Sequence, residues 1–469
     1  MKKWMALLLA TVMLLGLTAC GGGAENQPEA PAGLQVGFGK QDITPDTTRG
    51  ILLQGGDYKN RPSEGLLDKQ YVTCIALKEG EQTVLIFTMD YKVATHGFVE
   101  PAKILVSGAT GIDKANITFN ATHTHASAAV RYKWDGVEPV KEKFNTAAVA
   151  AAQEALADLS GAEVYAGSIQ TEGLAFVRHY LMDDDTITSG GDGTHAVKHL
   201  HDADTELQVV KFARAAQDKK DIVLLSFPSH ATCNEGGLNL SADYPAPLRD
   251  YVAEQTGTLV AFFQGASGDQ SPKSKVGKDY NDDYRDYGKR IGEYAVRALE
   301  DLHKLEGQVV NISTKTFTGP VNKKNVDKIV QAKEVQTLAQ NYGQGAPQTQ
   351  EALKKYGFAT YHEANWTVIR SNAGDTMSMD LVTVRVGDGL AFIMAPYEMF
   401  GQHGAAIKEK SPFDTTFIIT CSDEASPSYI ASTEAFDYNS YESYCTYYEQ
   451  GTGEKLVEEY VAMLTEMKG

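Results

Sequence analysis

Residues 117–125 read Ile-Thr-Phe-Asn-Ala-Thr-His-Thr-His, a short apolar and β-branched run that leads directly into two histidines. Residues 117–120 predict a buried strand. If the chain stays extended after that strand, alternate residues lie on one face, so His123 and His125 point the same way with Cα atoms about 7 Å apart. Two neutral imidazoles suit zinc, or one could bind a metal while the other moves a proton. The alternative is a pair of surface histidines in a loop.

Three further apolar runs end in the same manner, with polar residues directly after a predicted strand. These are 222–227 before Pro228-Ser229-His230, 259–263 before the loop 264–272, and 390–394 before Ala395-Pro396-Tyr397-Glu398. Functional side chains of α/β proteins gather at strand ends. His230 and Glu398 are therefore candidate site residues, and the alternatives are a structural histidine and a carboxylate in a surface turn.

Helix-like and strand-like runs alternate along the chain. The expected helices are 144–159, 284–302 and 454–467, with a polar helical stretch at 324–356 broken at 343–345; the expected hairpins are 72–76 with 83–89 and 381–386 with 390–394. This pattern predicts an α/β fold with mixed central β-sheets flanked by helices and a site at the strand ends. Because no repeat or linker follows Gly33, residues 34–469 are expected to form a single large domain.

The first 33 residues have a different character. Two lysines precede an unbroken apolar and small-residue run that Leu17-Thr18-Ala19-Cys20 closes, which predicts a signal peptide over residues 1–19. The cysteine after Leu-x-Ala resembles a bacterial lipobox, and this resemblance implies an exported protein, lipidated at Cys20 and anchored in the cell membrane. Residues 20–33 then form a flexible Gly/Pro/Glu tether. A plain signal peptide or an N-terminal anchor helix is the alternative.

Composition narrows the possible functions. Of the 469 residues 42% are hydrophobic and 22% charged, which excludes a disordered, collagenous or multi-span membrane protein. A formal net charge of −18 repels phosphate backbones, so no nucleic-acid partner is expected. Five cysteines are too few for a disulfide scaffold; Cys421 and Cys445 are the pair nearest in sequence, and they either pair or stay free.

The loop 264–272, Gln-Gly-Ala-Ser-Gly-Asp-Gln-Ser-Pro, has two glycines that permit a close backbone approach and could aim N–H groups at an oxyanion. Ser271 precedes Pro272, which restricts Ser271 to extended backbone. A tight turn without function is the alternative. The acidic, His-rich stretch 183–204 favours a solvated loop over a second cation site. The sequence contains no Walker loop, dinucleotide fingerprint, Cys-x-x-Cys pair, Gly-x-Ser-x-Gly elbow or His-Glu-x-x-His motif.

Taken together, five motifs resemble the N-terminal catalytic domain of the neutral/alkaline non-lysosomal ceramidases. In chain order they are Gly37-Phe38-Gly39-Lys40-Gln41-Asp42-Ile43-Thr44-Pro45, Asn120-Ala121-Thr122-His123-Thr124-His125, the loop 264–272, Pro396-Tyr397-Glu398, and Tyr429-Ile430-Ala431-Ser432 followed by Tyr441-Glu442. Each motif is weak by itself, but the set in this order is specific. It spans nearly the whole chain after the tether.

The resemblance implies a zinc-dependent amidase that hydrolyses the amide bond of ceramide or a related N-acyl lipid to a fatty acid and an amine. The zinc ligands would be His123, His230, Glu398 and Tyr429. The catalytic residues would be His125 as the proton-moving partner, Arg178 holding the substrate or the oxyanion, Ser271 as nucleophile or hydrogen-bonding group, and Tyr438 as an oxyanion donor.

Two questions stay open at this point. After His125 the family usually reads Ser-Gly-Pro-Gly-Gly, whereas this chain has Ala126-Ser127-Ala128-Ala129, which leaves the shape of the substrate pocket open. No general base adjoins Ser271 in sequence, which favours attack by water over a seryl intermediate. The alternatives are a zinc hydrolase of the same fold acting on another amide or ester, and a non-catalytic surface binding lipoprotein.

Overall fold

The computed structural model describes residues 33–54, 61–189, 194–277, 283–425 and 428–469. The predicted signal peptide, Cys20 and nearly all of the predicted tether lie outside the described residues. From Gly33 to Gly469 the chain forms one compact unit. In the part that is described, no helix is both long and apolar enough to cross a membrane.

Within the described residues, a nine-stranded mixed sheet has the order β14-β12-β11-β6-β1-β3-β4-β5, with β16 paired to β6. The pairs β4–β5 and β12–β14 are parallel, and the other neighbours are antiparallel. The strands are β1 (Gln35–Asp42), β3 (Tyr71–Glu79), β4 (Gln82–Met89), β5 (Ile117–Ala121), β6 (Ser160–Gln170), β11 (Glu206–Arg214), β12 (Ile222–Phe227), β14 (Leu259–Gln264) and β16 (His303–Leu305).

A second sheet has the order β17-β18-β19-β21, antiparallel except for the parallel pair β19–β21. Its strands are β17 (Val310–Pro320), β18 (Thr376–Val386), β19 (Leu390–Met394) and β21 (Thr415–Ile419). The longer helices are α1 (His96–Thr110), α2 (Val137–Ala157), α3 (Pro245–Thr256), α4 (Tyr284–Ala298), α5 (Ile329–Tyr342), α6 (Pro347–Tyr356), α7 (Tyr361–Ser371), α8 (Gly401–Lys410) and α11 (Thr452–Lys468). Two short ones are α9 (Thr433–Asp437) and α10 (Tyr441–Tyr444).

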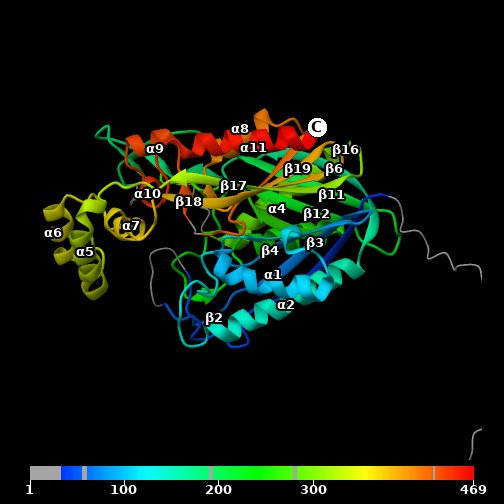
Figure 1. Cartoon of the computed structure of the whole chain (residues 1–469), viewed down its shortest axis with the longest axis horizontal. Helices are drawn as coiled ribbons and strands as arrows, with labels where there is room; N and C mark the ends of the chain where they lie inside the picture. Colours follow the sequence, from blue (N-terminus) through cyan, green and yellow to red (C-terminus); the bar gives the residue numbers. More distant parts are fainter. Residues whose placement is uncertain (1–32, 55–60, 190–193, 278–282, 426–427) are drawn as a thin grey trace, which may run out of the picture. The chain divides into compact units, whose positions relative to one another are not determined.

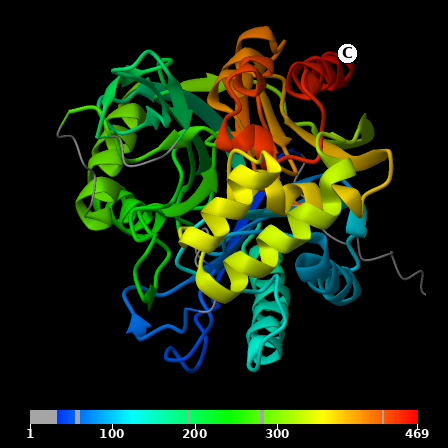
Figure 2. The same cartoon turned by 90° about the vertical axis from the view of Figure 1, so that its left-hand side faces the viewer.

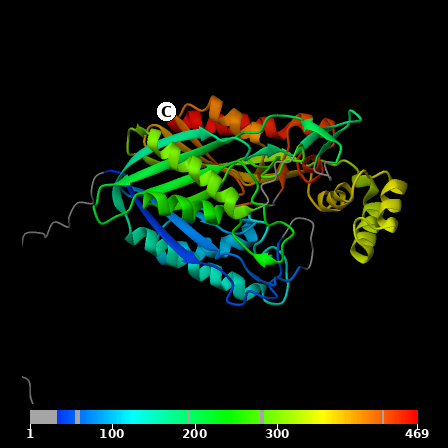
Figure 3. The same cartoon turned by 180° about the vertical axis from the view of Figure 1, so that it is seen from behind.

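Side chains that alternate along the strands give the large sheet two apolar faces. On β3, Cys74 and Ala76 pack toward α1 and α2, while Ile75 and Leu77 pack against the second sheet. The rest of the first face is covered by α3 and α4, and the outer face of the second sheet by α8 and α11. The fold is therefore layered: helices cover the large sheet, the large sheet packs on the second sheet, and helices cover the second sheet. Figures 1 and 3 show α8 and α11 on the side opposite α1 and α2.

Glycines in β1 let α2 lie directly on the strand. A Cβ at Gly37 would lie 1.9 Å from the carbonyl oxygen of Ala155, and one at Gly39 would lie 2.1 Å from that of Ala151. Both carbonyls belong to α2, whose contact face here consists of buried alanines. The chain therefore needs glycine at these positions for the close approach of helix and strand.

We predict that Gly39→Ala lowers the free energy of unfolding by about 1–3 kcal/mol, because the added methyl group meets helix backbone that cannot rotate away. Gly161→Ala in β6 is the matched control, since a Cβ there meets nothing within 4 Å. Urea unfolding of the two variants and the wild type checks this. Equal midpoints for both variants would contradict the packing argument.

The predicted α/β fold, with helices flanking mixed central sheets, is confirmed. The hairpin expected at 72–76 and 83–89 is the β3–β4 pair, and the stretch 324–356 forms α5 and α6 with a break between them. The helix expected at 144–159 is α2, which begins already at Val137. The sequence did not predict strand β1, because Gly37 and Gly39 lower its strand propensity.

The four cysteines of the described residues are buried and form no disulfide bond, so Cys421 and Cys445 are not joined to each other. The acidic stretch 183–204 contains an exposed turn at 183–185 between β8 (His179–Met182) and β9 (Ile187–Ser189). Helices α5, α6 and α7 share a small apolar core of their own between β17 and β18 in the sequence, and Figure 2 shows them in yellow toward the viewer.

Candidate metal centre

Four side chains that are far apart in the sequence meet at strand ends. His123 and His125 follow β5, His230 follows β12, and Glu398 begins β20 (Glu398–Met399) just after β19. Their exposed fractions are 1%, 8%, 0% and 8%, so all four are buried. The edge strands β5 and β14 of the large sheet lie in contact, and this brings the ends of β5 and β12 close together.

The four side chains point at a common centre. His123 Nε2 lies 3.3 Å from His125 Nε2 and 3.3 Å from Glu398 Oε2. His230 Nε2 lies 3.1 Å from the same carboxylate oxygen. Each of the three histidines offers a ring nitrogen within 4.8 Å of the others, which makes them a candidate metal-binding group.

Outer partners fix which ring nitrogen faces the centre. The Nδ1 of His123 donates to the carbonyl of Lys92 at 2.7 Å, and that of His230 donates to the carbonyl of Ser267 at 2.6 Å. The Nδ1 of His125 donates to Glu235 Oε1 at 2.7 Å. Because each Nδ1 carries the hydrogen, each Nε2 of the neutral ring presents a lone pair inward. Metal-binding histidines are oriented in the same way.

The donor atoms fit a metal ion. Zinc bonds of about 2.0–2.1 Å in a tetrahedron separate neighbouring donor atoms by about 3.3 Å, close to the 3.1 and 3.3 Å found here. Burial, together with Lys92, lowers the pKa of His125 to about 3, so its imidazole is neutral. Three lone pairs and a carboxylate that face one another repel unless a cation lies between them, so a divalent metal ion would stabilise the cluster.

The backbone of His123 is strained. Its φ is +63°, in the left-handed region, which costs a non-glycine residue on the order of 1 kcal/mol. The conformation is held because His123 N donates to the carbonyl of Tyr91 at 3.0 Å while the ring is held by Lys92. Strain of this kind gathers at functional sites, where it keeps a side chain in its working direction.

The loop 264–272 lies between two of the candidate ligands. A Cβ on Gly268 would lie 2.8 Å from the carbonyl oxygen of Glu398, and the N–H of Gly268 donates to the carbonyl of Met399 at 2.6 Å. The same loop holds His230 through the carbonyl of Ser267. Its glycine therefore serves the close approach that the sequence predicted, and the loop sets His230 and Glu398 relative to each other.

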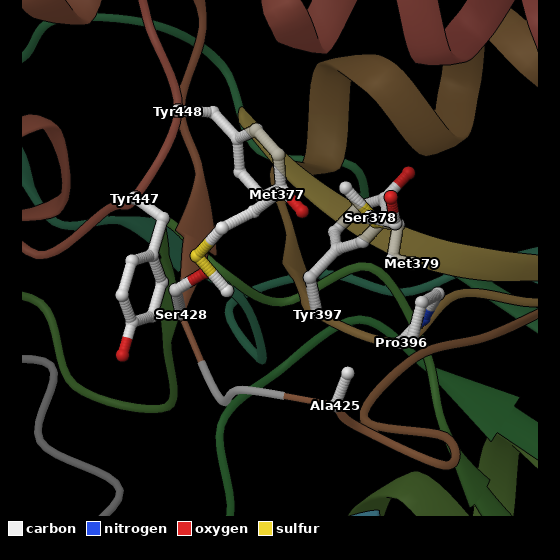
Figure 4. Close-up of a pocket in the computed structure, with 9 residues that line it drawn as sticks. All are labelled: Met377, Ser378, Met379, Pro396, Tyr397, Ala425, Ser428, Tyr447 and Tyr448. Atoms are coloured by element: carbon white, nitrogen blue, oxygen red, sulfur yellow. The ribbon is translucent and has the colours of Figure 1, made fainter. Parts of the chain in front are cut away.

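The other side of the strand pair that carries Glu398 is tightly packed. Glu398 N donates to the carbonyl of Ser428 at 3.0 Å, next to β22 (Tyr429–Ile430), which pairs with β20 in parallel. Tyr397 and Ser428 line a cavity of about 10 Å³ with Met377, Met379 and Tyr448 (Figure 4). That volume holds at most one water molecule, so the residues around the chain neighbour Tyr397 and the backbone partner Ser428 of Glu398 leave little empty space.

Tyr429 is paired with Glu398 in the β20–β22 register and is buried. Its ring stacks on His230 with centroids 6.5 Å apart, and the guanidinium carbon of Arg178 lies 5.5 Å from the Tyr429 ring centroid. Arg178 also donates to Glu442 Oε1 and to the carbonyl of Gly268, each at 2.8 Å. The structure thus brings both residues to the cluster, while their roles as ligand and oxyanion group stay predictions.

Tyr438 belongs to a buried chain of polar side chains beside Arg178. Its hydroxyl lies 2.7 Å from His179 Nδ1, and His179 Nε2 donates to Glu442 Oε2 at 2.9 Å. Burial opposes ionisation of Glu442, but His179 and Arg178 outweigh it and lower the pKa of Glu442 to about 2. Glu442 therefore positions Arg178 directly and Tyr438 through His179.

A cavity of about 660 Å³ lies against this chain of side chains. Its wall includes Arg178, Tyr438 and Tyr441, and other parts come from β9 and the start of α7. The volume is in the range of small-molecule sites. His230, Tyr429 and Arg178 connect the histidine cluster to the cavity by ring and cation contacts.

Ser271 lies in the two-residue strand β15 (Gln270–Ser271) and is half-buried. In the described structure its hydroxyl accepts a hydrogen bond from Lys273 N at 3.2 Å. Among the described residues no basic side chain contacts this hydroxyl, and the choice between water and Ser271 as nucleophile stays a prediction.

Solved structures share this architecture. Neutral ceramidase from Pseudomonas aeruginosa matches with a TM-score of 0.69 at 16% sequence identity, over 94% of this chain and 75% of that one. The chain has the neutral ceramidase fold. A ceramidase complexed with C2 matches with a TM-score of 0.66 at 14% identity, over 93% of this chain and 75% of that one. No protein-family model matches the sequence, and no curated protein matches it significantly.

Within this neutral ceramidase fold, Glu235 and His179 are site residues that the sequence did not reveal. Glu235 lies in a Gly-rich loop with no motif around it, and only the folded chain places it on His125. His179 directly follows the candidate residue Arg178, and this position beside Arg178 is the one feature of the sequence that points to His179. Glu442 belongs to the Tyr441-Glu442 motif, for which the sequence predicts no role. Its contacts to Arg178 and His179 show that it positions these two side chains.

We predict that Glu235→Gln weakens the binding of a metal ion by the histidine cluster about 10–100-fold, because the amide holds His125 less firmly and no longer supports its basicity. Glu64→Gln, at an exposed position, is the control. Titration of the variant and the wild type with a zinc indicator checks this. Wild-type values for Glu235→Gln would remove Glu235 from the site.

Proposed function

We propose that this chain is a zinc-dependent amidase of the neutral ceramidase type, which hydrolyses ceramide or a related N-acyl lipid to a fatty acid and an amine. The observation that carries the proposal is the convergence of His123, His125, His230 and Glu398, with inward lone pairs, in this fold. A non-catalytic binding protein would need no such convergence.

Three nitrogen donors and one oxygen donor form a set that zinc prefers. His123, His230 and Glu398 would hold the ion, with His125 or Tyr429 as a further ligand. When bound, zinc would polarise the amide carbonyl and lower the pKa of water.

The chain's own residues supply the remaining functions of the site. Where Tyr429 is the further ligand, the Nε2 of His125 is free, and Glu235 holds His125 in the orientation that lets this Nε2 take a proton from the attacking water. Arg178, kept in place by Glu442, would bind the developing oxyanion, and Tyr438 would bind the substrate oxygen from the cavity wall. Water is the proposed nucleophile, because the contact of Ser271 to Lys273 N supplies no base.

The cavity favours a second candidate substrate class. Besides tyrosines its wall carries the hydroxyl groups of Thr188, Ser189 and Thr360 and the side chain of Asn439. Such a wall also suits a polar amide or ester that has no long acyl chain. This alternative keeps the zinc site and changes only the substrate.

Hydrolysis of N-acylsphingosines with short and long acyl chains, beside a short N-acyl amine, tests the proposal. We expect the N-acylsphingosines to release fatty acid in a zinc-dependent manner. Hydrolysis of the short amide alone would favour the second class. Zinc bound without turnover of either substrate would contradict an amidase.

We also propose that the protein is exported and lipid-anchored at Cys20, on the strength of the lipobox-like sequence. Metabolic labelling with a fatty-acid analogue tests this. We expect label in the wild type and none in Cys20→Ser, and an unlabelled wild type would overturn the anchor.

A further inference from the structure

Arg370 is a buried cation that forms no ion pair within the described residues, although Glu363 attracts its charge from beyond ion-pair distance. It lies near the end of α7 with an exposed fraction of 1%. Its Nη1 donates to the carbonyls of Tyr444 at 3.2 Å and Thr446 at 3.4 Å, while its Nε has no acceptor. No described carboxylate forms an ion pair with it. Burying a charge without a counter-ion is unfavourable, so this arrangement favours the binding of an anion.

Arg370 is one of the residues that line a separate cavity of about 510 Å³. Lys323, Lys324 and Glu449 also line it, so cations outnumber carboxylates there although the whole chain has a net charge of −18. Lys324 Nζ lies 3.4 Å from Glu363 Oε1, and Lys323 Nζ lies 3.6 Å from Asp375 Oδ1. Both lysines thus have a carboxylate within 4 Å, whereas Arg370 has none at that distance among the described residues.

The remaining wall suits a small organic anion. Asn322 and Asn439 offer amide groups, and Phe436 and Tyr444 offer aromatic faces. Arg370 of α7 and Tyr444 of α10 line the cavity, and these two helices lie beside each other (Figure 1). It is distinct from the 660 Å³ cavity, although Asn439 and Tyr444 belong to the walls of both.

We propose that this cavity binds a small anion with a carboxylate or phosphate group, which Arg370 neutralises from the buried side and Lys323 and Lys324 from the other walls. A guanidinium presents a fork of donors that matches both groups. Burial lowers the pKa of Arg370 to about 10, which still leaves it charged at neutral pH. The proposal does not depend on the zinc site.

Calorimetric titration of the purified full-length protein with inorganic phosphate and, separately, with butyrate tests the proposal. We expect saturable binding of at least one anion. Arg370→Met should weaken it at least tenfold and Lys324→Gln several-fold, whereas Lys354→Gln on exposed α6 should leave it unchanged. Lys324→Gln removes a partly exposed charge, so this variant tests the proposal if Arg370→Met does not fold. Because anions also bind zinc, the titration is repeated in His230→Ala, where the Arg370-dependent binding should persist.

A second arm separates a free anion from a lipid headgroup. Co-sedimentation with phosphatidylglycerol vesicles, against phosphatidylcholine vesicles, should depend on Arg370 and Lys324 if the ligand is an anionic headgroup. Binding of phosphate, butyrate or phosphatidylglycerol that depends on these two residues supports the site. Absence of binding in all arms, or binding that both variants retain, overturns it.

Discussion

Replacing His230 by alanine is expected to remove the bound metal and to lower amide hydrolysis roughly a thousandfold or more. His230 is fully buried, its Nδ1 is held by the carbonyls of Ser267 and Gln270, and its Nε2 faces Glu398. Loss of a metal that supplies several kcal/mol of transition-state stabilisation corresponds to this factor in rate. Metal analysis of the purified variant and its hydrolysis rate are the two measurements.

The matched control for His230→Ala is His303→Ala, which changes an exposed histidine at the start of β16. We expect it to keep full metal content and activity. A His230→Ala variant that folds, retains stoichiometric zinc and hydrolyses at the wild-type rate would exclude His230 from the site.

Glu442→Gln is expected to lower the free energy of unfolding by about 3–5 kcal/mol and to reduce hydrolysis as well. Removing one partner of a buried ion pair leaves the other charge buried and uncompensated. Here Arg178 loses its carboxylate, and His179 loses the acceptor that orients it toward Tyr438. Urea unfolding measures the first effect. Glu351→Gln on exposed α6 is the control and should change neither quantity.

The stabilising contribution of Glu442 has a defined pH dependence. Its native pKa of about 2 lies below its ordinary value of 4.5, so the contribution is complete above about pH 5 and is lost as the pH falls toward 2. Its size is on the order of 3 kcal/mol. The stability difference between wild type and Glu442→Gln should therefore narrow from about pH 5 to about pH 3. A constant or widening difference would contradict a buried ionised Glu442.

Local pattern predicted the parts of the site that lie at strand ends. The His-x-His segment, His230 and Glu398 each follow a short apolar run that is visible in the sequence, and such positions share one edge of the fold. Glu235 is different, because its contact to His125 exists only after residues far apart in the chain have folded together. Residue type and spacing carry no signal for such a partner.

The same distinction applies to the secondary structure. Strand β1 contains Gly37 and Gly39, which lower strand propensity, yet tertiary packing requires them beneath α2. The start of α2 was missed because Pro139 stands in its first turn, a place where proline is tolerated. Strand β17 is largely exposed and alternates polar side chains, so it lacks the apolar run of a buried strand.

The most direct test of the central claim is the position of zinc in a crystal of the full-length protein, located by anomalous scattering at the zinc edge. We predict one strong peak within about 2.0–2.2 Å of His123 Nε2, His230 Nε2 and a Glu398 carboxylate oxygen. A crystal grown with zinc that shows no peak between these residues, or a peak held by other residues alone, would contradict the claim.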